Sequence, residues 1–239
     1  MNDGVLLAST HWDGVDYNSS ETVRDRPSLR VQFVPPPSPL VLAYDMETLT
    51  PDRRMLDRSG TGNHGTISGT TDVAGKVGRA REFDGIDDYI EVPDASSLHP
   101  TGAITIAAWV YLEADHTGGA PTMIRKQGSF LLELGDAGTN RPAFLLWWTD
   151  GTLTRLDGPS IPKFEWHHWA GTYDGTQMRL YIDGVVVSSL AISKTIAASS
   201  EPLRMSRWAT EWFQGILDEV QIYARALTAQ EIAALVSGH

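Results

Sequence analysis

The fold of this chain is clearest in residues 167–187, HHWAGTYDGTQMRLYIDGVVV. Two runs in this stretch, HHWAGTY and MRLYIDGVVV, are rich in the aromatic and β-branched side chains that favour strands. The pair Asp174 and Gly175 separates the runs, and the pair Asp183 and Gly184 falls inside the second run. Because Asp-Gly is a strong signal for a tight turn, the stretch predicts antiparallel strands joined by hairpins.

Similar apolar runs recur on both sides of this stretch, with further turn signals between them. They are VLAYDM (41–46), ITIAAWVYL (104–112), SFLLEL (129–134), AFLLWW (143–148) and GILDEVQIY (215–223). Many short strands, together with 22 glycines, predict an all-β sandwich or barrel made by pairing two antiparallel sheets. One helix is also expected, because Thr228 and Glu231 have the spacing of a capping box and Ile232 and Leu235 give an apolar side.

The composition excludes several classes of function. The chain has 239 residues and a net charge of −11, whereas duplex nucleic acid and anionic membranes bind basic surfaces. It has no cysteine, which excludes disulfides, zinc–thiolate sites, iron–sulfur clusters and a thiol nucleophile. No run approaches the ~18 apolar residues of a membrane-spanning helix, and residues 1–7 lack the features of a signal peptide. We expect neither a nucleic-acid partner nor membrane insertion.

The clearest internal boundary is PPPSP at residues 35–39, where four prolines favour a stiff, extended linker. Before it, Leu29, Val31 and Phe33 alternate with polar residues, which predicts a strand in a segment too short for its own core. We expect residues 1–34 to be the remnant of an upstream β module, paired with an edge of the same chain or with another copy. Residues 40–239 are expected to form one domain.

Six segments carry a resemblance to a known family: LVLAYDME (40–47), LDRSGTGNHGTI (56–67), GRAREFDGIDDYIEVPDASSL (78–98), ITIAAWVY (104–111), WHHWAGTYDGTQMRLYIDG (166–184) and GILDEVQIYARALTAQEIAAL (215–235). They resemble the bacterial laminin-G-like, concanavalin A-like jelly-roll family. The resemblance implies a two-sheet antiparallel jelly-roll sandwich with one short C-terminal helix. Residues 12–33, WDGVDYNSSETVRDRPSLRVQF, resemble the final strands of a DNRLRE-type extracellular β-sandwich module.

An oxygen-rich loop, DRSGTGNHG at residues 57–65, predicts a structural calcium site. Calcium takes about six to eight hard oxygen ligands, and the loop offers Asp57, Asn63 and backbone carbonyls. In the family that the chain resembles, this loop lies beside the first and last strands, which implies that Glu47 and Asp218 face the same ion. Alternatively, Asp57 accepts hydrogen bonds from its own loop and Asp218 from a neighbouring turn, without a metal.

A second candidate metal site is the stretch FDGIDDY at residues 83–89. It offers Asp84, Asp87 and Asp88. Their spacing suits a turn between two strands at least as well as a metal site.

Tryptophan is abundant, with eight in the chain, and its placement suggests a ligand surface. Trp147 and Trp148 are adjacent on one expected strand, so they must point to opposite faces. If Phe144, Leu146 and Trp148 face the core, Trp147 lies on the outer, concave surface. Exposed indoles of this kind stack on the apolar faces of sugar rings.

The segment SRWATEWFQG at residues 206–215 adds Trp208 and Trp212, with Arg207 beside them. Arg207 and Lys126 are expected to orient sugar hydroxyls or an acidic substituent. The alternative is that the loop tryptophans cover one end of the core. Trp109 and Trp166 fall at positions that the resembling family fills with core aromatics.

No catalytic residues are expected. Retaining glycosidases need two carboxylates about 5 Å apart, whereas Asp218 and Glu219 are adjacent and would lie on opposite faces of a strand. The histidine pair His167 and His168 lies within a sandwich-strand motif, so its role is expected to be structural. The glycine-rich segments match no phosphate-binding pattern.

The sequence therefore predicts a non-catalytic carbohydrate-binding module of an extracellular or cell-surface bacterial protein. We expect a structural calcium ion, a polysaccharide or other glycan as ligand, and neighbouring domains in a larger parent protein. The alternatives are a protein-adhesion or structural spacer domain and, less favoured by the residues, a glycan-active enzyme (polysaccharide lyase or glycosidase).

Overall fold

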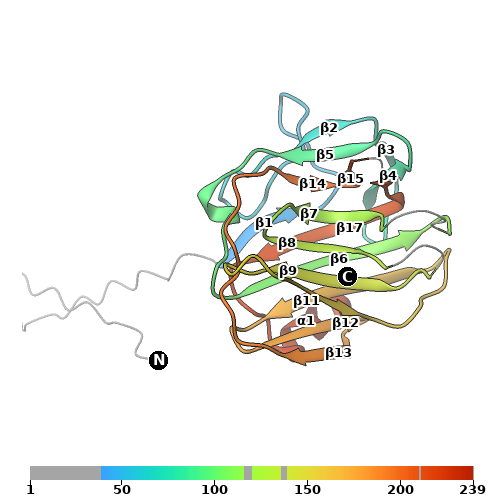
Figure 1. Ribbon diagram of the computed structural model, residues 1–239. Coiled ribbons are helices and arrows are strands. Elements are labelled where there is room, and N and C mark those ends of the chain that lie inside the picture. The colour runs from blue at the N-terminus through green and yellow to red at the C-terminus, as the bar shows by residue number, and fades with distance from the viewer. Residues whose placement is uncertain (1–38, 116–119, 136–138, 210, 239) are drawn as a thin grey trace, which may run out of the picture. The chain divides into compact units, whose positions relative to one another are not determined.

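Two antiparallel sheets pack face to face in the computed structural model, which describes residues 39–115, 120–135, 139–209 and 211–238 (Figure 1). The eight-stranded sheet has the order β13 (Val185–Ala191), β12 (Gln177–Ile182), β11 (Trp166–Tyr173), β6 (Ile104–Leu112), β17 (Gln214–Tyr223), β4 (Arg79–Asp84) and β3 (Thr71–Ala74), with β1 (Leu40–Tyr44) also paired to β17. The seven-stranded sheet has the order β10 (Leu153–Asp157), β9 (Pro142–Trp147), β8 (Phe130–Leu134), β7 (Thr122–Lys126), β14 (Leu203–Met205), β5 (Tyr89–Val92) and β2 (Thr66–Ser68).

A short hairpin of β15 (Arg207–Trp208) and β16 (Glu211–Trp212) follows β14, and a single 3-10 turn, η1, spans Ser96–Leu98. This architecture confirms the predicted all-β sandwich. The expected β remnant at residues 1–34 and most of the proline linker lie outside the described residues, so those predictions stay untested. No helix in the described ranges is long and apolar enough to cross a membrane.

The last strand, β17, occupies the middle of the eight-stranded sheet. One of its edges pairs with β6 along most of its length. Its other edge is shared, because the first half of β17 pairs with β4 and the second half with β1. Strands from the beginning and the end of the domain therefore meet at the centre of one sheet.

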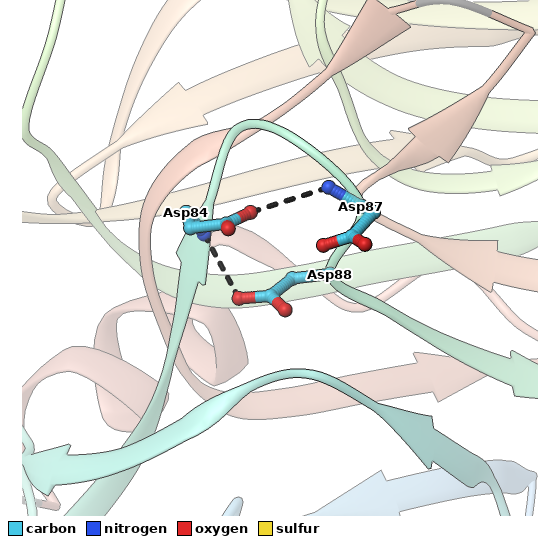
Figure 2. A group of neighbouring side chains, drawn as sticks. All are labelled: Asp84, Asp87 and Asp88. Atoms are coloured by element: carbon cyan, nitrogen blue, oxygen red, sulfur yellow. Dashed lines mark hydrogen bonds between the residues drawn. The ribbon is translucent and has the colours of Figure 1, made fainter.

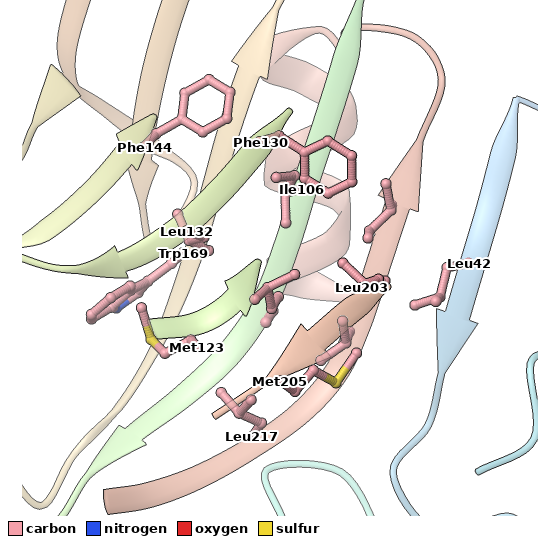
Figure 3. Close-up of a cluster of buried hydrophobic side chains, with 14 of the residues drawn as sticks. Leu42, Ile106, Met123, Phe130, Leu132, Phe144, Trp169, Leu203, Met205 and Leu217 are labelled. Atoms are coloured by element: carbon pink, nitrogen blue, oxygen red, sulfur yellow. The ribbon is translucent and has the colours of Figure 1, made fainter. Parts of the chain in front are cut away.

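The core lies between the sheets and is made by the inward-facing half of each alternating strand pattern (Figure 3). Phe130 and Leu132 from β8, and Phe144 from β9, meet Ile106 and Trp169 of the other sheet in one buried cluster. Trp148 is also inside, with its ring centre 5.1 Å from that of Tyr173. The predicted inward orientation of Phe144, Leu146 and Trp148 is confirmed.

The predicted turn and helix signals are also confirmed. Asp183 and Gly184 both have positive φ, 50° and 81°, as a tight hairpin turn between β12 and β13 requires. The helix α1 spans Ala229–Ser237 and begins with the expected capping box of Thr228 and Glu231. Its buried residue Ile232 packs with a second apolar cluster.

This second cluster lies on the outer face of the eight-stranded sheet. Ala107 of β6, Ala170 of β11 and Tyr181 of β12 alternate with residues that face the core, and all three pack with Ile232. The helix therefore covers part of one outer face. It leaves the outer face of the seven-stranded sheet uncovered.

The expectation that Trp109 and Trp166 are core aromatics is wrong, because neither lies between the two sheets. Trp109 is buried, but it points outward from β6, since its neighbours Ala108 and Val110 face the core. Lys76 lies 4.4 Å above the Trp109 ring. Trp166 is half-buried on the same outer face, and the place inside the sandwich is taken by Trp169.

Candidate functional site

The outer face of the seven-stranded sheet carries a row of residues set by strand register. Leu131 and Leu145 form the centre of this row, and both are buried in a small cluster apart from the main core. The complete row, from β2 to β10, is Thr66, Glu91, Arg204, Arg125, Leu131, Leu145 and Arg155. Three arginines thus lie on one line across the face. We call this line the arginine row.

Trp147 lies on this face, as its alternation with Trp148 predicts. It is half-buried and packs against the cluster that contains Leu131 and Leu145. The guanidinium carbon of Arg125 lies 5.6 Å from the centre of the Trp147 ring. An indole held in this way combines an apolar surface with a neighbouring cation.

The β15–β16 hairpin supplies a second aromatic and cationic group. Arg207 pairs in register with Trp212, which is half-buried. The guanidinium carbon of Arg207 lies 5.7 Å from the centre of the Trp212 ring and 4.8 Å from that of Tyr89 on β5. The backbone of Trp208 pairs with Glu211, and its side chain lies outside what the structure describes.

Lys126, which was expected beside the glycan, lies elsewhere. Its side chain is fully buried, opposite the core residue Phe130, and its ammonium group donates to Asp94 and to the carbonyl of Glu201. A bulge in β7, between Thr122 and Ile124, resets the alternation of this strand. Because the side chain turns inward, we leave Lys126 out of the candidate site.

Sequence reasoning missed Glu133, which lies on the same outer face. The side chain is 6% exposed, and its oxygen lies 3.0 Å from the guanidinium of Arg155. Burial raises the pKa of Glu133 to about 7; Arg155 and Arg125 oppose this rise, and Glu211 and Asp157 add to it. A charged residue inside the apolar run SFLLEL was the available signal, but its partners come from distant strands.

The loop that was expected to bind calcium instead closes the free edge of β1. Asp57 accepts a hydrogen bond from the amide of Ala43 at 3.0 Å. Thr61 and Asn63 both donate to the carbonyl of Val41, at 2.8 and 2.7 Å. Side chains thus replace a neighbouring strand, which is one way to protect a sheet edge.

Both oxygens of Asp57 are fully used within this loop. They accept from the amides of Ser59 and Asn63 and from the hydroxyls of Ser59 and Thr61. Burial raises the pKa of Asp57, but these bonds, together with that from Ala43, outweigh burial and hold the pKa below its usual value. The geometry favours the alternative in which the loop is closed without a metal.

The other two expected ligands, the exposed Glu47 and the buried Asp218, both accept hydrogen bonds from another segment. Glu47 accepts from the amide of Arg79 at 3.0 Å, and Asp218 accepts from the amide of Val77 at 2.9 Å. Both carboxylates therefore reach the turn between β3 and β4, residues 75–79. Neither pairs with a lysine or arginine side chain of the described residues.

Asp218 is fully buried, and burial raises its pKa to about 7 despite hydrogen bonds from Val77 and Glu219. Strict alternation does not hold here, because β17 has a bulge between Asp218 and Gln221, where Glu219 has a φ of 47°. Alternation therefore does not set the relative sides of Asp218 and Glu219.

The aspartates of the β4–β5 turn do lie together, as Figure 2 shows. Ligating oxygens of Asp84, Asp87 and Asp88 all lie within 4.8 Å of one another, the one such trio among the described residues. Asp84 accepts from the amides of Ile86 and Asp87, and Asp88 accepts from the amide of Asp84. These bonds are the ones that stabilise a turn.

The histidine pair is built into the β11–β12 region. Nδ1 of His167 lies 2.7 Å from an Asp183 oxygen, and the amide of His168 donates to the other oxygen at 2.8 Å. The His168 ring packs edge-on against Trp109. Asp183 thereby ties the hairpin turn to the neighbouring strand, in keeping with the expected structural role.

Comparison with known proteins identifies the family. The chain belongs to the family described as the concanavalin A-like lectin/glucanases superfamily, whose model matches residues 84–233. A search of curated protein sequences found no match.

Solved structures with the same fold include several binding domains. The chain matches the binding domain of Paraclostridial Mosquitocidal Protein 1 with a TM-score of 0.69 and 18% identity, over 83% of this chain and 52% of that one. It matches domain 4 of AbnA, a GH43 extracellular arabinanase from Geobacillus stearothermophilus solved with arabinotriose, with a TM-score of 0.64 and 22% identity, over 84% and 100%. The binding domain of Botulinum Neurotoxin DC, solved with SialylT, gives 0.65 and 12%, over 84% and 51%.

The chain thus spans about half the length of the two toxin domains and the whole of AbnA domain 4. At these identities the likeness concerns the fold. The neighbours named here are binding domains or a domain solved with a bound oligosaccharide.

Proposed function

We propose that this domain binds a carbohydrate without transforming it, on the outer face of the seven-stranded sheet and on the adjoining β15–β16 hairpin. One observation carries the proposal: Trp147, on the face that α1 leaves uncovered, and Trp212, on the adjoining hairpin, each have an arginine guanidinium near the ring. Indole rings stack on the apolar faces of sugars, while nearby arginines donate hydrogen bonds to hydroxyls. The arabinotriose complex of AbnA domain 4 supports a glycan as the ligand class.

The test is a glycan array followed by calorimetry on each glycan that binds. Trp147→Ala and Trp212→Ala are each expected to weaken binding about tenfold or more, since a well-placed ring contributes ~1–2 kcal/mol. The melting temperature of both variants should stay within a few degrees of the parent. Trp166→Ala is the matched control, because Trp166 is also half-buried but lies on the outer face of the other sheet.

A large fall in melting temperature with unchanged glycan affinity would assign both rings to structural packing. If no glycan binds the intact chain, the alternative of a protein-adhesion or spacer domain replaces the proposal.

A glycan-active enzyme is the remaining alternative, and Glu133 is the group that it would use. A general acid requires a raised pKa, which Glu133 has, but its oxygen is paired with Arg155 and its side chain is nearly enclosed. We assign Glu133 to holding the arginines in place. Chromatography of each bound glycan after prolonged incubation should show no shorter or unsaturated products.

We also propose a structural calcium ion, held by Glu47 and Asp218 at the turn of residues 75–79. The donor set fits, because calcium prefers carboxylate and backbone carbonyl oxygens. A buried Asp218 with a raised pKa and no cationic partner among the described side chains would gain from a divalent ion. We leave Asp57 and Asn63 out of this set, because Asp57 accepts from its own loop and from Ala43, and Asn63 donates to Val41 and accepts from Ser97.

The parent protein is proposed to be extracellular or attached to the cell surface, with this domain as one of several. The support is indirect: AbnA domain 4 belongs to an extracellular enzyme and the toxin neighbours are binding domains. An antibody against the chain should detect it in culture medium or on intact cells. Detection only after cell lysis would contradict this.

A further inference from the structure

The charge of Arg207 has no acidic partner among the described residues, whereas two arginines of the arginine row do have one. Arg155 pairs with Glu133 at 3.0 Å, and Arg204 pairs with Glu91 at 2.7 Å. The Arg207 guanidinium makes no hydrogen bond or ion pair with any residue in the described ranges, although its backbone pairs with Trp212. Acidic side chains outnumber basic ones by 30 to 19 in this chain, so an unneutralised arginine here is not due to a shortage of carboxylates.

Two aromatic rings hold this guanidinium group in place. Its carbon lies 4.8 Å from the centre of the Tyr89 ring and 5.7 Å from that of Trp212. Stacking uses the flat face of a guanidinium, whereas all five N–H donors lie in its plane. Contact with the rings therefore positions the group without using its hydrogen-bonding capacity.

We propose that the glycan bound at this face is acidic, and that Arg207 receives its carboxylate or sulfate group. This inference rests on the proposed carbohydrate-binding function and specifies the ligand class of the same site. Carboxylate and sulfate both present pairs of oxygens that match the planar fork of an arginine. A sugar ring packed near Trp212 brings such a substituent within reach of Arg207.

The surroundings of Arg207 support an anionic ligand at short range. The arginine row adds Arg204, Arg125 and Arg155 across the same face, although acidic partners balance part of their charge. The net charge of −11 opposes any anion at long range. Recognition must then depend on direct contact with a cation such as Arg207, whose charge no carboxylate of the described residues neutralises.

The experiment uses pairs of oligosaccharides that differ only in charge. Uronate oligomers are compared with their carboxyl-reduced forms, and sulfated oligomers with their desulfated forms, by calorimetry on the full chain. The charged member of at least one pair should bind at least about tenfold more tightly than its neutral counterpart, the range expected for charge-assisted hydrogen bonds. The two kinds of pair distinguish carboxylate from sulfate.

Variants assign the effect to Arg207. Arg207→Gln should abolish the preference for the charged member, and Arg207→Lys should restore only part of it, because lysine lacks the planar fork. Arg179→Gln is the matched control, since Arg179 lies on β12 of the other sheet and pairs with Asp174. Trp212→Ala should weaken binding of both members and also reduce the preference for the charged one, because Trp212 helps to position Arg207.

The outcomes separate this inference from the function on which it rests. Equal binding of charged and neutral members overturns the acidic ligand and leaves carbohydrate binding intact. A preference for charge that survives in Arg207→Gln overturns the role of Arg207. The absence of binding to every oligosaccharide, neutral or charged, overturns the proposed function and this inference together.

Discussion

Glu133 shows how burial gives one carboxyl an unusual dependence on pH. Its pKa lies near 7 in the folded chain, against an ordinary value of 4.5. Between these two values the folded chain holds a proton that the unfolded chain has lost. The free energy of unfolding contributed by this group is therefore fully present below about pH 4.5 and falls as the pH rises to about 7.

We predict that Glu133→Gln removes this part of the pH dependence. The difference in unfolding free energy between parent and variant should change by about 1–3 kcal/mol from pH 4.5 to pH 7, measured by denaturant titration at several pH values. Glu165→Gln controls for net charge, because it alters an exposed carboxylate directly before the first residue of β11. Parallel stability profiles for the parent and Glu133→Gln would contradict the prediction.

Asp57 offers a second prediction at the level of one side chain. Asp57→Ala leaves the amides of Ala43, Ser59 and Asn63 without their acceptor. Each buried donor without a partner costs about 1–3 kcal/mol, so we expect a loss of about 2–5 kcal/mol in the free energy of unfolding.

Asp52→Ala is its control, because Asp52 lies in an exposed turn and bonds locally to Thr50 and Arg54. A loss from Asp57→Ala no larger than that from Asp52→Ala would show that the loop does not depend on this carboxylate. Chemical denaturation of both variants at one pH supplies the comparison.

Among the elements, the turn between β3 and β4 is the one that the proposed calcium ion would stabilise. An ion that binds only the folded state adds ~3 kcal/mol when its concentration is a hundredfold above the dissociation constant. A chelator should then lower the melting temperature by several degrees, and Asp218→Ala should abolish this sensitivity. Asp57→Ala should retain it, since Asp57 serves the other loop.

An unchanged melting curve in chelator, together with no ion in elemental analysis of the purified chain, would exclude the calcium site. The same pair of variants also separates the two loops. If the effect of the chelator on the melting temperature disappears in Asp57→Ala but persists in Asp218→Ala, the ion lies at residues 57–63 instead.

The elements also show what local pattern can and cannot predict. Alternation correctly places Trp147 outside and Trp148 inside, and the capping box correctly locates the start of α1, because both depend on near neighbours in the chain. The prediction that Lys126 contacts the glycan was wrong, because the bulge in β7 changes which residues of that strand face the core.

The partners of the candidate site were beyond prediction for a related reason. The salt bridge between Glu133 and Arg155 joins β8 to β10, and the contact of Arg207 with Tyr89 joins residues more than a hundred positions apart. Strand register across β8, β9 and β10 sets the first contact, and register is a property of the whole sheet. Sequence reasoning found Trp147, Trp212 and Arg207, but not the pairing of Glu133 with Arg155 or the contact of Arg207 with Tyr89.

At the scale of the whole molecule, β11 and β9 belong to different sheets and face each other across the core. Gly171 faces Phe144 across the core, and an added Cβ would lie 2.4 Å from the ring. We predict that Gly171→Ala lowers the free energy of unfolding by about 1–3 kcal/mol through overpacking. At Gly102 an added Cβ meets nothing within 4 Å, so Gly102→Ala should change it by no more than about 0.5 kcal/mol.

Equal stability of the two alanine variants in thermal and denaturant unfolding would mean that the sheets can separate without cost at β11. A large loss of unfolding free energy in Gly171→Ala alone would show that the contact between Gly171 and Phe144 cannot relax.

The central place of β17 has a consequence for how the protein is made. Residues 214–223 pair with β1, β4 and β6, so the eight-stranded sheet lacks its middle strand until most of this domain has been synthesised. Pairings across such long separations in sequence form slowly. A chain that stops before Gln214 leaves β1, β4 and β6 each with an edge that lacks its partner, and such edges are open to association with other chains.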